Sequence, residues 1–259
     1  MTSTVAPPTA ARVWIAALRL PTLVAAIVPV AVGTALAYRD YRFRLGPALA
    51  ALAGALAIQI GTNFANDLYD FRKGADSTER IGPPRVLPLG WLSPATVSRA
   101  MFASFSIAML AGIYLTWAAG WPVVAIGLAS IAAGIGYTKG RWALAYHGMG
   151  DLAVFVFFGL VAVAGTYFVQ ARLVTPLAFL TAIPVGTLCT AILVVNNVRD
   201  LDTDRAAGKR TLAVHLGRGR TRIEYGVLLA IAFGVPLALW LRGSLSVAAL
   251  LPYATASLA

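Results

Sequence analysis

Uncharged apolar runs long enough to cross a lipid bilayer recur along the whole chain. About 20 apolar residues in a helix span the hydrocarbon core of a membrane. The runs are continuous rather than alternating, and Ala and Leu dominate them, so they indicate helices and not membrane strands. The sequence therefore predicts an all-α, polytopic transmembrane helix bundle with about eight spans. The candidate spans are residues 13–37, 46–66, 95–118, 121–138, 152–171, 174–198, 223–241 and 244–259.

The two ends of the chain carry separate expectations. Residues 1–11 are expected to be a disordered N-terminus, and residues 12–259 to form a single transmembrane domain. The first apolar run is too long for a signal peptide. The last run reaches Ala259 without a polar flank, which indicates a C-terminal helix that is cut short.

The net charge of +11 is distributed unevenly over the predicted loops. Of the 21 Lys and Arg residues, 16 fall on one side of the predicted membrane and 5 on the other. This asymmetry follows the positive-inside rule, and it accounts for the charge without nucleic acid as a partner. It places the N-terminus and the two longest loops, residues 67–94 and 199–222, in the cytoplasm and the protein in the cell membrane.

Seven of the ten acidic residues lie in two segments at the cytoplasmic ends of predicted spans. In each segment an Asn and two Asp residues share one helix face, at i, i+4, i+7 in the first and i, i+4, i+8 in the second. Asp202 would point away from its neighbours. These first and second acidic faces, 133 residues apart at Asp67 and Asp200, indicate two four-helix halves that each donate one face. The faces consist of Asn63, Asp67 and Asp70, and of Asn196, Asp200 and Asp204.

Carboxylate and carboxamide oxygens are the ligands that Mg²⁺ prefers, and it completes its shell with water and substrate phosphates. Basic residues are interspersed with the acids, a composition typical of a polyphosphate site, although a structural ion-pair network is the alternative. A site of this kind in front of an apolar bundle favours a polyprenyl diphosphate, with a charged head and an oily tail. The basic residues are Arg72, Lys73, Arg80, Arg85, Arg199, Arg205, Lys209 and Arg210.

Three blocks of the sequence resemble the UbiA superfamily of intramembrane prenyltransferases, and most of all its 1,4-dihydroxy-2-naphthoate polyprenyltransferase branch. They are NFANDLYDFRKGADSTERIGPPR from Asn63, YTKGRWALAYHGMGD from Tyr137 and NNVRDLDTDRAAGKRTLAVHLG from Asn196. The resemblance covers nearly the whole chain. It implies nine helices around a central cavity, and Asp151 stands where this branch usually has Glu.

The resemblance implies Mg²⁺-dependent transfer of a polyprenyl group to 1,4-dihydroxy-2-naphthoate, with loss of CO2 and diphosphate, to give demethylmenaquinone. Two Mg²⁺ ions would bridge the diphosphate. The implied catalytic residues are Asp67, Asp70, Asp200, Asp204 and Asp151. The implied metal ligands are Asn63, Asp67, Asp70, Asp76, Asn196, Asp200 and Asp204. The implied substrate-binding residues are Arg72, Lys73, Lys139, Lys209, Arg210, Tyr137 and Tyr146.

Several alternatives stay open from the sequence. Lys139 is equally explained as a positive-inside anchor, and Asp151 as a helix cap. The acceptor could be 4-hydroxybenzoate or homogentisate instead of the dihydroxynaphthoate. A membrane cation transporter is a further alternative, but its acids would be expected near the middle of the membrane rather than at helix ends among bases.

Overall fold

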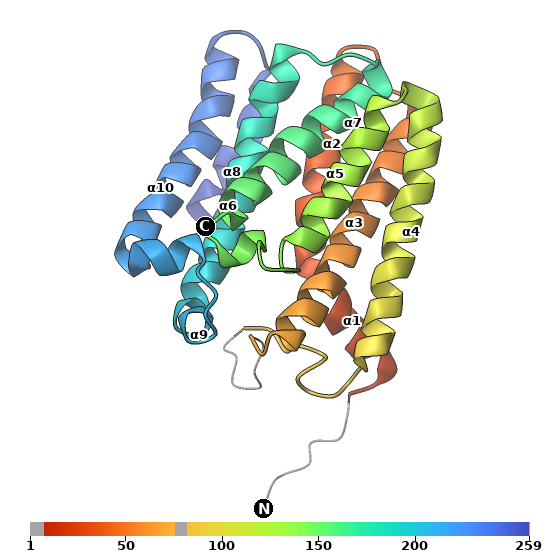
Figure 1. Cartoon of the computed structure of the whole chain (residues 1–259). Coiled ribbons are helices and arrows are strands. Elements are labelled where there is room, and N and C mark those ends of the chain that lie inside the picture. Colours follow the sequence, from red (N-terminus) through yellow and green to blue (C-terminus); the bar gives the residue numbers. More distant parts are fainter. Residues whose placement is uncertain (1–7, 76–81, 259) are drawn as a thin grey trace, which may run out of the picture.

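The computed structural model describes residues 8–75 and 82–258, and within these ranges it contains helices and no β-strand. Figure 1 shows long helices packed side by side in one bundle. The elements are α1 (Ala10–Leu18), η1 (Leu20–Leu23), α2 (Val24–Arg39), α3 (Leu45–Arg72), α4 (Pro94–Ala119), α5 (Pro122–Gly136), η2 (Leu144–Tyr146), α6 (Gly150–Val154), the π-helix η3 (Phe155–Val161), α7 (Ala162–Ala171), α8 (Pro176–Arg199), α9 (Leu201–Ala206), α10 (Leu212–Leu241) and η4 (Val247–Leu258).

The helices have the length and composition of membrane spans, so the predicted all-helical, multi-pass membrane fold is confirmed. Large apolar side chains such as Phe102, Leu110 and Ile113 point outward, where lipid would cover them. Six stretches are long and apolar enough to cross a membrane, and a seventh is apolar but shorter. The six are Ala10–Arg39, Leu45–Arg72, Pro94–Ala119, Gly150–Ala171, Pro176–Arg199 and Leu212–Leu241, and the seventh is Pro122–Gly136.

Two predicted spans differ from the observed elements. The helix expected over 223–241 lies in α10, which begins at Leu212, where the Thr211 side chain accepts from the Val214 N–H, and is broken at Gly217, whose φ of 76° and ψ of 165° are not helical. Residues 212–222 contain several basic residues, so they were not included in the predicted apolar span. The segment expected over 244–259 forms the 12-residue 3₁₀ helix η4 rather than a regular α-helix.

The two halves of the chain meet where α2 packs against α7, while α3 packs against α4 and α8 against α10. The contact between halves depends on Gly33, because a Cβ there would lie 2.5 Å from the Val163 carbonyl oxygen. Small residues at such contacts let membrane helices approach closely.

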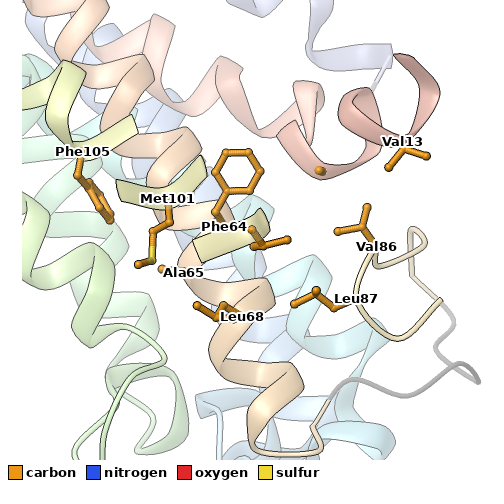
Figure 2. Packing of buried hydrophobic residues seen from close by; sticks show 10 residues of the cluster. Val13, Phe64, Ala65, Leu68, Val86, Leu87, Met101 and Phe105 are labelled. Atoms are coloured by element: carbon orange, nitrogen blue, oxygen red, sulfur yellow. The ribbon is translucent and has the colours of Figure 1, made fainter. Parts of the chain in front are cut away.

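A buried cluster fixes the loop that follows the first acidic face (Figure 2). Val86 and Leu87 are buried against Leu68 of α3 and its neighbours, and Val13 of α1 belongs to the same cluster. Burial of such side chains contributes about 1.5–3 kcal/mol each. Arg85 precedes Val86 in this loop. It is therefore held beside the end of α3 that we predict to face the cytoplasm.

Candidate active site

Asp67, in the first acidic face, is buried with two arginines on one carboxylate oxygen. Its side chain is 2 % exposed, and Arg19 and Arg85 both donate to Oδ1. Arg19 comes from a break between α1 and η1, where its φ of 53° is left-handed. Arg19 was not among the site residues predicted from the sequence. The available signal was an arginine inside an apolar run of membrane-span length, which is costly unless it has a partner or a function.

Asn63 holds this break in place. Its amide nitrogen donates to the Leu18 carbonyl oxygen at 3.1 Å and to Thr22 Oγ1 at 2.9 Å, and its oxygen accepts from Gln59 at 3.4 Å. These contacts tie α3 to the segment that carries Arg19. The metal-ligand role predicted for Asn63 stays a prediction.

Asp70 connects the first acidic face to the second. The Tyr146 hydroxyl donates to its Oδ1 at 2.9 Å, and the Lys209 ammonium lies 3.8 Å from its Oδ2. The same ammonium lies 3.7 Å from Asp204 Oδ1. One cation therefore lies within 4 Å of carboxylates from both halves of the chain.

The second acidic face does not lie on one continuous helix. Helix α8 ends at Arg199, and Asp200 stands between α8 and α9 with φ −92° and ψ 9°. Arg199 binds both carboxylate oxygens of Asp200 at 2.8 Å. Asp202 points away as predicted: its side chain is 70 % exposed and pairs with Arg218 at 2.7 Å, whereas that of Asp204 is 13 % exposed. Asn196 is half-buried on the last turn of α8.

The other predicted substrate-binding residues surround two tyrosine rings. The Lys73 ammonium donates to the carbonyl oxygens of Thr138 at 2.6 Å and Gly140 at 3.1 Å, and it lies 3.9 Å from the Tyr146 ring centre. Lys209 lies 5.7 Å from the same ring. Partial burial lowers the pKa of Lys73, the Asp70 carboxylate opposes this, and the Lys209 ammonium adds to the lowering. Crowded ammonium groups of this kind are stabilised by an anion.

Arg72, Lys139 and Arg210 are exposed and form no ion pair with an acid of the described residues. Arg72 and Lys139 lie 5.8 and 5.5 Å from the Tyr69 ring centre, and Arg210 is exposed. The structure thus brings Lys73, Lys209 and Tyr146 to Asp70, and leaves these three cations on the rim.

Asp151 lies at the start of α6 and is 6 % exposed. Neither of its carboxylate oxygens has a hydrogen-bond partner among the described residues. Tyr137 is the link to the acidic faces, because the charges of Asp151, Asp70 and Asp204 all act on its hydroxyl. Asp151 is therefore close to the site but is not one of its ion pairs.

The described residues contain no three acidic, His or Cys side chains close enough to share one metal ion. The acids are instead paired with Arg and Lys. The donor set still fits Mg²⁺, because it consists of carboxylate oxygens from both halves that converge on one cationic group at Lys209. Asp76, also predicted as a ligand, lies outside the described residues.

Comparison with known proteins identifies the family of this helix bundle, whose acidic helix ends lie together. The sequence profile of the UbiA prenyltransferase family matches residues 26–259. The chain belongs to the UbiA prenyltransferase family. It is thus a membrane prenyltransferase, as the sequence blocks indicated.

Two relatives carry the same name, 1,4-dihydroxy-2-naphthoate octaprenyltransferase. The Mycobacterium tuberculosis protein is 42 % identical over 219 residues, which cover 85 % of this chain and 75 % of the relative. The Escherichia coli protein is 38 % identical over 224 residues, which cover 84 % of this chain and 73 % of the relative.

A solved UbiA family structure shares the fold. The UbiA homologue from Archaeoglobus fulgidus, bound to DMAPP and Mg²⁺, matches with a TM-score of 0.69 over 91 % of this chain and 80 % of that one. The two sequences are 15 % identical, so this likeness concerns the fold alone.

Proposed function

We propose that this UbiA prenyltransferase transfers a polyprenyl group from polyprenyl diphosphate to 1,4-dihydroxy-2-naphthoate, with loss of diphosphate and CO2, to give the quinol form of demethylmenaquinone, at the same oxidation level as the acceptor ring. The observation that carries the proposal is the Lys209 ammonium between Asp70 and Asp204, which joins the two acidic faces into one site. The names of the relatives from M. tuberculosis and E. coli support the acceptor.

Asp67, Asp70, Asp200 and Asp204, with Asn63 and Asn196 behind them, would hold Mg²⁺. When bound, Mg²⁺ supplies charge that neutralises the diphosphate leaving group. The A. fulgidus homologue, solved with Mg²⁺ and a prenyl diphosphate, supports Mg²⁺ as the metal. We propose two ions, since four carboxylates exceed what one Mg²⁺ usually takes from a protein.

The cations of the site would bind the diphosphate oxygens. Arg19 and Arg85 each carry several N–H donors and a positive charge, and each donates to Asp67. Lys73 and Lys209 present ammonium groups on the other side, around Tyr146. Arg72, Lys139 and Arg210 on the rim would attract the anion from the aqueous phase.

Ionisation of the C–O bond to diphosphate would leave an allylic cation at the first prenyl carbon. The rings of Tyr137 and Tyr146 can stabilise it through their π faces, and the surrounding helices exclude water. The acceptor ring carbon that bears the carboxylate forms the new C–C bond, and its bond to CO2 then breaks. The electrons of that bond restore the aromatic ring, so no net proton transfer is needed.

We propose that the site faces the cytoplasm in the cell membrane. The ends of α3, α1 and α9 lie at the same end of the bundle (Figure 1). The 16-to-5 distribution of Lys and Arg supports this orientation.

The experiment that tests the function uses the purified protein in vesicles with a labelled polyprenyl diphosphate. Dihydroxynaphthoate and 4-hydroxybenzoate are offered in parallel, with Mg²⁺ or with chelator. Mg²⁺-dependent product from the dihydroxynaphthoate supports the proposal. Product only from 4-hydroxybenzoate would move the chain to another acceptor, and cation flux without product would favour a transporter.

A further inference from the structure

A second acidic residue lies near Asp151 inside the bundle, and the proposed use of the site leaves it unexplained. Glu224 belongs to α10, in a predicted membrane-spanning helix, and its Oε2 is buried without a hydrogen-bond partner among the described residues. The charge of Asp151 acts on Glu224, so the two carboxyl groups lie within electrostatic range of each other. Within the part of the chain that the structure describes, three buried carboxyl oxygens from two helices thus lack donors.

No described protein group donates to those oxygens. The Thr190 hydroxyl of α8 lies beside this segment, but it donates to the Gly186 carbonyl oxygen at 2.8 Å. Its contact with Asp151 is to the backbone carbonyl oxygen, at 3.4 Å. An unmet buried acceptor costs about 1–3 kcal/mol, and more when it is charged, so this pair would gain much from a ligand that donates hydrogen bonds.

The pair lies next to the site where the prenyl diphosphate would bind. The Tyr137 hydroxyl packs against the start of α6, where a Cβ at Gly150 would lie 2.9 Å from it. The same hydroxyl feels the charges of Asp70 and Asp204. Tyr137 therefore lies within electrostatic range of Asp70 and Asp204 as well as of Asp151.

The chemistry of the two substrates decides which one the pair can take. A prenyl tail has no hydrogen-bond donor, and a diphosphate has no donor either and carries several negative charges, which two carboxylates would repel more strongly than the single carboxylate of a hydroxylated aromatic acid. A hydroxylated aromatic ring supplies O–H donors, and a carboxylate that accepts from a ring hydroxyl increases the electron density of the ring. The ring becomes a better nucleophile toward an allylic cation.

We propose that Asp151 and Glu224 together form the acceptor subsite, in which each carboxylate accepts a hydrogen bond from one hydroxyl group of a dihydroxylated aromatic ring. This assignment rests on the proposed function and specifies its second substrate class. Glu224 is the new residue in it, because it comes from the opposite half of the chain from Tyr137 and closes the subsite from α10.

The test compares Glu224→Gln, Asp151→Asn and the control Asp40→Asn in vesicles. Asp40 is a carboxylate outside the proposed site, where it accepts from the Tyr167 hydroxyl at 2.7 Å. We expect Glu224→Gln and Asp151→Asn to raise the KM for dihydroxynaphthoate about tenfold or more, the equivalent of one charged hydrogen bond. The KM for the prenyl diphosphate should stay unchanged, and the control should change neither value. An unchanged acceptor KM in folded variants, or equal rises in both KM values, would overturn the proposal.

A binding measurement separates this inference from the function itself. Dihydroxynaphthoate alone should raise the melting temperature of the detergent-solubilised wild type, and a ring with one hydroxyl methylated should do so less. Glu224→Met, which leaves no polar atom at this position, should fold and should not distinguish the two compounds. If the wild type shows this discrimination but makes no product, the proposed function fails and the subsite stands. If the wild type makes product and Glu224→Met still discriminates, the subsite fails and the function stands.

Discussion

The Lys209 ammonium lies 3.8 Å from a carboxylate oxygen of Asp70, a residue from the other half of the chain. The side chain of Lys209 is 17 % exposed and that of Asp70 is 3 % exposed. Because Lys209 also lies 3.7 Å from Asp204, one ammonium group neutralises acids from both faces. We propose that the Lys209 ammonium also binds the diphosphate, and that Mg²⁺ can neutralise the same carboxylates. These two roles of the positive charge lead to the first prediction.

Lys209→Met should weaken both the fold and the binding of the diphosphate. Removal of one partner from a largely buried ion pair typically costs about 3–5 kcal/mol, and less here because the group is partly exposed. Added Mg²⁺ should raise the melting temperature of this variant more than that of the wild type, because Mg²⁺ replaces the missing positive charge. Thermal unfolding with and without Mg²⁺ measures both effects, and an equal shift in the two proteins would refute the shared-cation interpretation.

The four aspartates of the two faces should be far more sensitive than Asp202. Asp67→Asn, Asp70→Asn, Asp200→Asn and Asp204→Asn each remove a charge from the proposed Mg²⁺ ligands and should lose nearly all turnover. Asp202→Asn should keep a measurable fraction, because Asp202 is exposed and pairs with Arg218. Turnover at saturating Mg²⁺ provides the comparison. A folded Asp202→Asn variant that is as inactive as Asp200→Asn would show that the exposed position takes part in the site.

Arg19 should be needed for turnover although it lies in the first apolar run. Arg19→Gln removes a charge that the structure places on Asp67, and we expect at least about a tenfold loss in kcat/KM for the prenyl diphosphate. Arg12→Gln is the matched control, since Arg12 lies in the same segment and is exposed. Equal activity of the two variants would mean that Arg19 only anchors the N-terminal segment.

The proposed orientation predicts opposite labelling of two single-cysteine variants. Ala206→Cys in α9 should react with a membrane-impermeant thiol reagent only after cells are opened. Tyr41→Cys should react in intact cells, because Tyr41 is 98 % exposed in the loop between α2 and α3, at the other end of the bundle. The native Cys189 is buried and should contribute little background. Labelling with the reverse pattern would contradict the cytoplasmic assignment.

The fold could be predicted further than the site. Continuous apolar runs indicate membrane helices because the bilayer requires every backbone group to be paired within them. The helical period also placed Asp202 away from Asp204, as the structure confirms. The end of α8 at Arg199 did not follow from this period, since helix ends are set by local backbone geometry.

The contacts between distant segments could not be predicted from the sequence. Arg19 reaches Asp67 only because the chain breaks there and Asn63 holds the break. Glu224 lies in none of the sequence motifs, and its position near Asp151 depends on how α10 packs. Such contacts arise from tertiary packing of helices, which residue spacing along one helix cannot reveal.

Removal of Mg²⁺ should abolish turnover without unfolding the protein. The acids of the site have basic partners in the described structure, so the fold does not depend on the metal. A chelator should stop product formation, and Mg²⁺ added in excess should restore it. Full turnover in chelator would exclude the proposed metal role of the two acidic faces.

The most direct measurement of the central claim uses dihydroxynaphthoate with a labelled carboxylate carbon, together with a polyprenyl diphosphate and Mg²⁺, in vesicles that contain the purified protein. The account predicts one labelled CO2 released for each prenylated ring formed, and neither product from the Asp70→Asn variant. A prenylated product that retains the labelled carboxylate, or equal product from Asp70→Asn, would contradict it.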